Sequence, residues 1–136
     1  MMVSEKELIK AAQIAREQAY VPYSHFAVGA VLLTQTGQIY TGCNIENSSF
    51  SLTNCAERTA MFKAISAGER DFANLTVIAD TADPVSPCGA CRQVLAEFCA
   101  PDMPVILTNL HGAVQHTTVA ELLPYAFKGE QMSDGQ

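Results

Sequence analysis

The sequence predicts an α/β fold in which helices cover a sheet that begins with a hairpin. Three observations carry this prediction. Short apolar segments rich in β-branched residues alternate with segments of helical periodicity. Two early strand-like segments flank a turn at residues 36–38 that contains Gly37. The chain has 136 residues and is 49% hydrophobic, which suits one domain with a substantial core, so we expect residues 1–136 to form a single domain.

The N-terminal half predicts one helix followed by the hairpin. Ser4 and Glu7 have the spacing of a capping box, and Leu8 then begins a series of apolar residues at helical spacing. This helix must end before Pro22. The hairpin strands are predicted over residues 26–33 and 39–43.

The rest of the chain continues the alternation. Thr53 or Asn54 is placed to cap a second helix that Gly68 ends, and Thr118 is placed to cap a short last helix. The tail over 128–136 is polar, and we expect it to be loose. The elements predicted between these points are helices over about 55–67, 88–99 and 118–123 and strands over 75–79, 105–107 and 114–117.

Charge and targeting signals exclude several classes of function. The net charge is -6, from 8 Lys and Arg against 14 Asp and Glu, which argues against a nucleic-acid partner. No apolar run approaches the roughly 20 residues of a membrane-spanning helix, so no membrane partner is expected. The N-terminus lacks the layout of a signal peptide, which favours the cytoplasm, where thiols stay reduced. An odd count of five cysteines then fits metal binding better than disulfides.

The strongest chemical signal is a split set of cysteines that encloses a glutamate. It consists of Asn-Cys-Ala-Glu-Arg over 54–58 and Pro-Cys-Gly-Ala-Cys-Arg over 87–92. Three thiols from two separate segments of the chain can hold one zinc ion and leave its fourth position open for water. This is the arrangement of a catalytic zinc site. Glu57 is the candidate to handle the protons of that water, so the motif predicts a hydrolytic zinc enzyme.

Both cysteine groups are predicted at helix N-termini, where free N–H groups and the helix dipole favour thiolate over thiol. Cys55 and Glu57 do not share a helix face, but both can reach a site beyond the helix end. Cys88 and Cys91 share a face. Three thiolates leave the zinc site with a net charge near minus one, and we expect Arg58 and the two helix dipoles to withdraw it.

Other interpretations of these cysteines stay open. A Cys-x-x-Cys pair can be a redox motif, although this leaves the glutamate motif unexplained. A structural zinc site would need a fourth protein ligand from Cys43, Cys99 or a histidine. Cys43 and Cys99 are expected to be small core residues. None of the three histidines is assigned to the metal, and Arg92 can equally be a solvated surface charge.

The two-part motif resembles the signature of the cytidine deaminase family. Pro22-Tyr23-Ser24 with 26–30 resembles the family's first strand, and 42–47 resembles its nucleoside-binding stretch, so the resemblance covers nearly the whole chain. It implies a three-layer α/β/α sandwich with a mixed, mostly parallel five-stranded sheet. With cysteine at position 55 in a short single-domain chain, the sequence resembles the small homotetrameric branch of the family, which has one zinc per subunit. This resemblance implies a homotetramer with sites at subunit interfaces.

The resemblance also implies roles for individual residues. Cys55, Cys88 and Cys91 would bind zinc, and Glu57 would transfer protons to the ring N3 and the leaving amine. Residues with implied contacts to the nucleoside are Phe26 against the pyrimidine, Asn44 and Glu46 at the ribose hydroxyls, the Ala56 N–H at the base carbonyl, and Phe127 in its own or a neighbouring subunit's site. The family often has tyrosine where this chain has Phe50, so that hydroxyl is absent here.

The implied reaction is hydrolytic deamination of cytidine and 2′-deoxycytidine to uridine and 2′-deoxyuridine, with release of ammonia, in pyrimidine salvage. One alternative keeps this chemistry on an aminonucleoside antibiotic. A second alternative is a non-enzymatic zinc-stabilised module, in which Glu57 would be dispensable. A phosphorylated substrate is disfavoured because no phosphate-binding cluster is evident.

Overall fold

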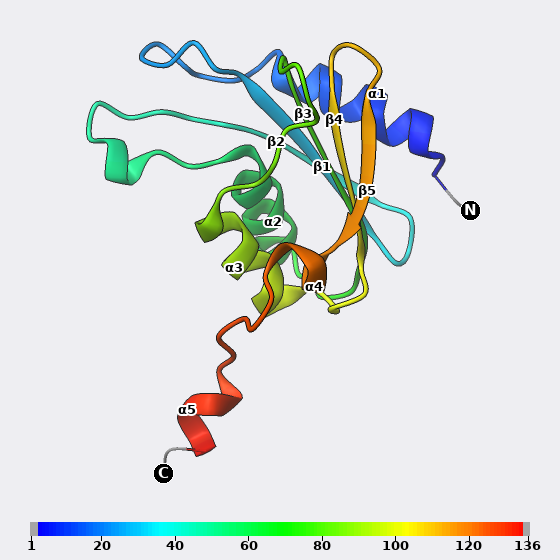
Figure 1. Ribbon diagram of the computed structural model, residues 1–136, viewed down its shortest axis with the longest axis vertical. Helices are drawn as coiled ribbons and strands as arrows, with labels where there is room; N and C mark the ends of the chain where they lie inside the picture. Colours follow the sequence, from blue (N-terminus) through cyan, green and yellow to red (C-terminus); the bar gives the residue numbers. More distant parts are fainter. Residues whose placement is uncertain (1–2, 135–136) are drawn as a thin grey trace.

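The computed structural model describes residues 3–134 and contains a five-stranded sheet between helices (Figure 1). Strand β2 has the predicted bounds, and the helices begin and end within about two residues of the predictions, apart from an earlier end to the first. The elements in chain order are α1 (Glu5–Arg16), β1 (Val28–Thr34), β2 (Ile39–Cys43), the 3-10 turn η1 (Phe50–Leu52), α2 (Ala56–Ser66), β3 (Phe72–Ala79), α3 (Gly89–Phe98), β4 (Pro104–Asn109), β5 (Val114–Thr118), α4 (Val119–Leu122) and α5 (Glu130–Asp134).

The sheet is mixed, as predicted, but the expectation that it is mostly parallel is wrong. Its strand order is β2-β1-β3-β4-β5, and β3–β4 is the parallel pair, whereas β1–β2, β1–β3 and β4–β5 are antiparallel. The strands β2, β3 and β4 do share one direction. They are not all neighbours, however, because the first hairpin places β1 between β2 and β3. The helix α2 therefore crosses over β1 to connect two strands that do not touch.

Helices cover both faces of the sheet, which confirms the three-layer arrangement (Figure 1). On one face α1 packs through Leu8 and Ala12 on Val31 and Ile106. The opposite face carries the larger core, in which buried side chains of α2, α3 and α4 cluster with those of β1, β3 and β4. This second face is the one that matters for the site, because α2 and α3 carry the two cysteine groups.

Two glycines let the helices approach the sheet closely from opposite sides. A Cβ at Gly29 would lie 2.1 Å from the carbonyl oxygen of Ala12 in α1. A Cβ at Gly42 would lie 2.3 Å from the carbonyl oxygen of Ala56 in α2. Both distances are well inside van der Waals contact, so these positions admit no side chain without displacing the helix.

The helix caps partly match the sequence predictions. The capping box of Ser4 and Glu7 is present, and Thr118 accepts a hydrogen bond from the Glu121 N–H at the start of α4. The N-cap of α2, however, is Cys55 rather than Thr53 or Asn54. Asn54 forms a β-bridge with Ile45, and its side chain bonds Thr59 instead.

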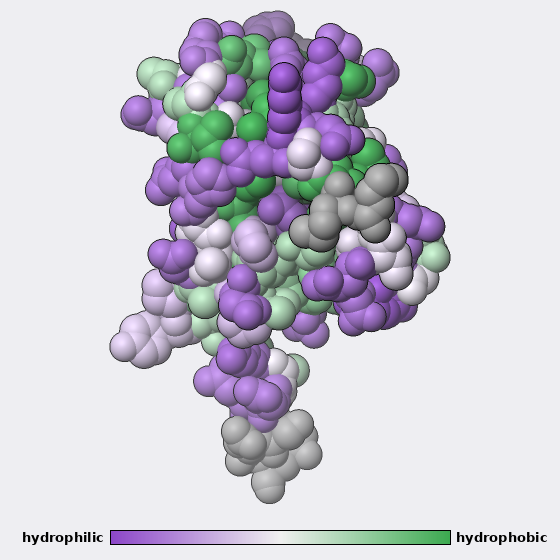
Figure 2. Space-filling model, turned by 90° about the vertical axis from the view of Figure 1, so that its right-hand side faces the viewer, coloured by the Kyte–Doolittle hydropathy of each residue, from purple (hydrophilic) through white to green (hydrophobic). Residues whose placement is uncertain are grey.

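Past α4 the chain leaves the body of the domain and ends in the short helix α5 (Figure 1). A view from the side of the N-terminus shows this segment projecting below a surface where hydrophilic and hydrophobic residues are interspersed (Figure 2). A helix was not expected there. The looseness of residues 128–136 stays a prediction, and residues 135 and 136 lie outside the described part. Within residues 3–134, every helix is too short or too polar to cross a bilayer.

Candidate active site

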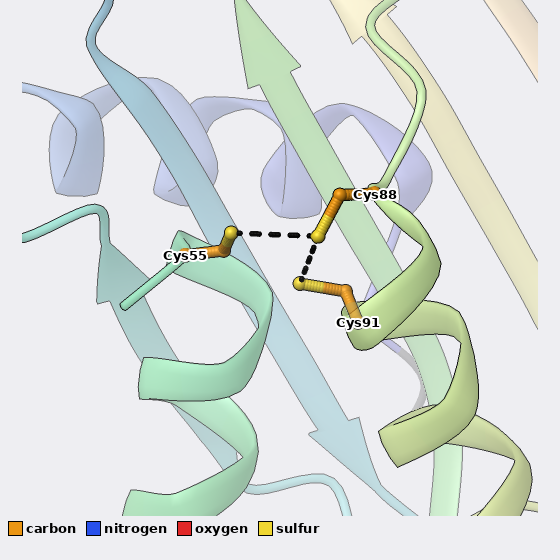
Figure 3. Close-up of side chains that lie close together, drawn as sticks. All are labelled: Cys55, Cys88 and Cys91. Atoms are coloured by element: carbon orange, nitrogen blue, oxygen red, sulfur yellow. Dashed lines mark hydrogen bonds between the residues drawn. The ribbon is translucent and has the colours of Figure 1, made fainter. Parts of the chain in front are cut away.

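The structure brings the three cysteines of the split motif together. Cys55 and Cys88 are the N-cap residues of α2 and α3, and Cys91 lies in the first turn of α3. Their side chains point toward one another from the two helix ends (Figure 3). The Sγ atoms of Cys55 and Cys88 are 3.6 Å apart, as are those of Cys88 and Cys91, and all three lie within 4.8 Å of one another.

This spacing fits a zinc ion. Zn–S bonds of about 2.3 Å in a tetrahedral site place two sulfur ligands about 3.8 Å apart. The observed separations of 3.6 Å are close to that value and far too long for a disulfide, whose sulfurs are about 2.05 Å apart. Within residues 3–134 the cluster contains these three thiols and no fourth protein ligand. The donor set therefore suits a three-ligand site with one position open.

Among residues 3–134, neither the other two cysteines nor any of the three histidines belongs to the cluster. Cys99 is buried in the core, as expected, whereas Cys43 is only half-buried at the end of β2. His111 lies 2.8 Å from Asp80, and the ring of His116 contacts Glu5. These positions remove the geometric support for a closed structural site.

The surroundings of Cys55 favour its thiolate. Hydrogen bonding with Cys91 and the Arg58 guanidinium holds the pKa of Cys55 well below that of an ordinary thiol. The Arg58 Nη2 donates to the Cys55 Sγ at 3.4 Å, so this guanidinium lies where it can withdraw charge from the cluster. The N-cap positions of Cys55 and Cys88 add the positive ends of two helix dipoles. Arg58 is thus not a solvated surface charge.

Glu57 lies beside the cluster in the first turn of α2 and is only 4% exposed. Burial raises the pKa of Glu57 to about 7, because a charged carboxylate loses hydration there. A carboxyl group that titrates near neutral pH can both accept and deliver protons, which is the property required of a general acid–base. The preceding residue, Ala56, is the first of the helix, so its N–H has no acceptor within α2 and is available to a ligand.

One extended segment links the metal cluster to the predicted sugar-binding residues. Ile45 exchanges two backbone hydrogen bonds of 2.9 Å with Asn54, the residue before Cys55. On its other side, the flanking residues of Ile45 bond the backbone of Tyr20. Alternation along this segment turns Asn44 and Glu46 inward, where both are 9% exposed, and leaves Ile45 half-exposed.

The polar atoms of Asn44 hold the loop that precedes β1. Its Oδ1 accepts from the Val28 N–H at 2.9 Å, and its Nδ2 donates to the Phe26 carbonyl at 2.7 Å. Phe26 itself lies outside β1 and is 43% exposed, so its ring is not a core residue. The sequence alone did not distinguish a ring packed in the core from a ring that contacts a ligand. An exposed ring beside buried polar groups suits contact with a flat ligand.

Phe127 lies in the segment between α4 and α5, outside the two helices that carry the cysteines. Phe127 is 55% exposed, and its segment stands away from the body of the domain (Figure 1). The Gln93 Nε2 donates to the Phe127 carbonyl at 3.0 Å and so attaches this segment to α3.

The sequence did not reveal the role of Arg92. It left open whether this arginine acts near the cysteine cluster or is a solvated surface charge. The guanidinium donates to the carbonyls of Pro87 and Leu122, both at 2.8 Å, and to the Ser86 hydroxyl at 2.6 Å. It therefore ties the loop before Cys88 to the end of α4. The signal in the sequence is its position directly after Cys91, on the helix that begins at the cysteine cluster.

Comparisons with known proteins agree with this geometry. A profile of the family described as "Cytidine and deoxycytidylate deaminase zinc-binding region" matches residues 2–107. A cytidine deaminase from Sporosarcina psychrophila is 65% identical over 128 residues, covering 94% of each chain. The crystal structure of a cytidine deaminase from Burkholderia pseudomallei superposes with a TM-score of 0.91 at 51% identity. This match covers 92% of this chain and all of that one.

A more distant match concerns the antibiotic alternative. A blasticidin-S deaminase from Bacillus cereus is 33% identical over 129 residues, covering 89% of this chain and 90% of its own. This identity is about half that of the Sporosarcina psychrophila protein.

Proposed function

The chain belongs to the cytidine and deoxycytidylate deaminase family, and from this premise we propose that it hydrolyses cytidine and 2′-deoxycytidine to uridine and 2′-deoxyuridine, releasing ammonia. The observation that carries the proposal is the juxtaposition of three thiols at two helix N-termini with the buried Glu57. A role in pyrimidine salvage follows from this reaction.

Cys55, Cys88 and Cys91 would hold one zinc ion per subunit. When bound, zinc supplies a Lewis acid that makes water nucleophilic near neutral pH, so that it can attack C4 of the pyrimidine. Glu57 takes the two protons of that water in turn. It passes the first to ring N3 and the second to the leaving amino group, and the balance of the reaction is one water consumed and one ammonia released. A carboxyl group with a pKa near neutrality suits both transfers.

The remaining hydrogen-bonding capacity of Asn44 and Glu46 supports a nucleoside substrate with either sugar. Asn44 already accepts one hydrogen bond from Val28 on its Oδ1 and donates one amide hydrogen to Phe26, which leaves one hydrogen to donate and one lone pair on Oδ1. Glu46 keeps acceptor capacity on its Oε2. One donor and one acceptor satisfy a single hydroxyl, so a second hydroxyl on the ribose is not required. The carboxylate also disfavours a phosphate at this point.

Phe26 and Ala56 are proposed to position the base, the first by packing of its ring and the second through its free N–H. We expect Phe127 to complete the site of a neighbouring subunit, because it is half-exposed on a projecting segment.

A homotetramer would cover the apolar surface next to the site. Tyr20, Tyr23, Ile45, Phe50 and Leu52 are each between 46% and 70% exposed, and the rings of Tyr23 and Phe50 contact edge to face at 5.9 Å. Exposed apolar groups gathered in this way mark an interaction surface. Sedimentation velocity of the parent and of Phe50→Glu tests this. A parent protein that sediments as a monomer would refute the tetramer, and a dissociated variant would place Phe50 in the interface.

The cytoplasm, or another reducing compartment, suits this site, since thiolate ligands must not be oxidised. All five cysteines are free in the structure.

The decisive experiment follows the ultraviolet absorbance of cytidine mixed with zinc-loaded protein. Replacement of the cytidine band by that of uridine would establish the reaction class and the substrate together. An unchanged spectrum with zinc confirmed bound would refute cytidine as substrate. An aminonucleoside antibiotic assayed in parallel then distinguishes the runner-up substrate from a structural zinc module, which would deaminate neither.

A further inference from the structure

We infer that Ser24 is a positioning residue that joins the sugar-binding and base-binding parts of the site into one hydrogen-bonded unit. This inference rests on the proposed function and concerns a residue whose hydroxyl lies outside the zinc cluster. Ser24 is in the loop between α1 and β1, and the structure gives its hydroxyl two partners. It donates to the Glu46 Oε2 and accepts from the Phe26 N–H at 3.0 Å.

The first step concerns which oxygen of Glu46 is available to a substrate. Its Oε1 accepts the backbone N–H groups of Tyr23 at 3.0 Å and Ser24 at 3.1 Å, which uses both lone pairs of that oxygen. A substrate hydroxyl must therefore bind Oε2. This is the oxygen that the Ser24 hydroxyl holds, so Ser24 fixes the direction of the remaining lone pair.

The second step concerns Phe26. Its N–H is held by the Ser24 hydroxyl and its carbonyl by the Asn44 side chain at 2.7 Å. The backbone of Phe26 is thus held on one side by Asn44 and on the other by Ser24, which itself bonds Glu46. A displacement of Glu46 is transmitted to Phe26 through a single hydroxyl.

The third step concerns the residue between Ser24 and Phe26. His25 has a φ of 59°, in the left-handed region that is uncommon for residues other than glycine. Such a conformation persists when neighbouring contacts hold it. The His25 N–H bonds the Val21 carbonyl at 3.0 Å on one side, and the Ser24 hydroxyl anchors the loop on the other.

The test compares two substrates in four proteins. The substrates are cytidine and 2′,3′-dideoxycytidine, which lacks both hydroxyls that could reach Glu46. The proteins are the parent, Ser24→Ala, Ser24→Thr and the matched control Ser66→Ala, which removes an exposed hydroxyl at the end of α2. Binding of uridine and 2′,3′-dideoxyuridine by calorimetry gives a second readout that does not depend on turnover.

We expect Ser24→Ala to lower kcat/KM for cytidine about tenfold, mainly through KM, which is the size of one lost hydrogen bond to a charged group. The fall for dideoxycytidine should be about twofold at most, because only the support of Phe26 is lost there. Ser24→Thr should restore the parent values, and Ser66→Ala should match the parent. In a Glu46→Gln background, Ser24→Ala should have little further effect on cytidine.

Equal losses on both substrates, or no loss on cytidine, would overturn the inference. If Ser24→Ala does not fold, the same comparison of substrates is made with Ser24→Thr, which keeps the hydroxyl, and Ser24→Cys, which lacks it. Equal preference for cytidine over dideoxycytidine in these two variants would also overturn the inference. A parent protein that does not deaminate cytidine would refute the proposed function and this inference together, whereas an active parent with an unselective Ser24→Ala refutes the inference alone.

Discussion

The substitution Gly42→Ala tests whether the close packing of α2 on the sheet is required for activity. Gly42 is in β2, where it faces α2 on the side of the larger core. The added Cβ would lie 2.3 Å from the Ala56 carbonyl oxygen and 2.5 Å from the Ala60 nitrogen. Both contacts are with backbone, so no side-chain rotation can relieve them.

The size of the effect follows from these distances. Ordinary contacts of a Cβ begin at 3.4 Å, so the Ala56 end of α2 must retreat by about 1 Å. Overpacking of this kind costs about 1–3 kcal/mol of stability. The same movement displaces Cys55 and Glu57, which flank Ala56. A misplacement of about 1 Å in catalytic groups lowers the rate by roughly 100-fold.

Gly29→Ala is the matched control, because its Cβ would lie 2.1 Å from the Ala12 carbonyl oxygen on the opposite face of the sheet. The helix that it displaces, α1, carries no proposed site residue. Urea unfolding should show a similar loss of stability for both variants, whereas kcat/KM on cytidine, measured with zinc content determined, should fall far more for Gly42→Ala. Equal losses of kcat/KM in the two variants would refute this account of how α2 is positioned.

Three further predictions concern single side chains. Glu57→Gln should lower kcat by about 10²–10⁴ while the zinc content and the circular dichroism spectrum stay unchanged, and near-parental turnover would remove Glu57 from the mechanism. Hydrogen bonds from the Ser24 hydroxyl and two backbone N–H groups lower the pKa of Glu46 below its ordinary value. Its carboxylate therefore stabilises the fold at and above the ordinary pKa of a glutamate, and this stability is lost as the pH falls through the lowered pKa. Urea unfolding across the acid range should therefore give a flatter profile for Glu46→Gln, and identical profiles would contradict the assignment. Arg92→Ala should lose about 2–3 kcal/mol of stability and release zinc to a chelator faster, because three hydrogen bonds at Ser86, Pro87 and Leu122 are removed. The control Arg70→Ala removes an exposed arginine that also bonds backbone carbonyls, and equal zinc release from both variants would argue against the tether.

The parts of the structure that sequence predicts best are those encoded locally. The capping box at Ser4, the bounds of β2 and the position of Cys91 one turn after Cys88 depend on neighbours within a few residues. The cap of α2 shows where local preference fails. Asn54 has a strong intrinsic preference for the N-cap position. Its backbone is instead paired with Ile45 in a β-bridge, so the helix begins one residue later and Cys55 is the N-cap.

The sheet direction and the contacts of Ser24 and Arg92 depend on pairing between distant segments. Nothing in residues 26–43 indicates that β1 will insert between β2 and β3, which is the reason that most neighbouring pairs are antiparallel. Ser24 meets Glu46 across 22 residues, and Arg92 meets Leu122 across 30. Side-chain type alone does not identify such partners.

The backbone bridges at Ile45 explain how these distant contacts become one site. The same three-residue segment pairs with Tyr20 on one side and with Asn54 on the other, and Asn54 precedes Cys55. The separations between the loop proposed to bind the base, the side chains proposed to bind the sugar and the cysteine cluster are therefore set by strand register. A slip of one residue would turn Asn44 and Glu46 outward and Ile45 inward. Register therefore places the proposed nucleoside-binding residues, whereas the local cysteine spacing places the proposed metal ligands. A short motif is enough to predict those ligands, but the partners that hold Asn44 and Glu46 depend on pairing between distant segments.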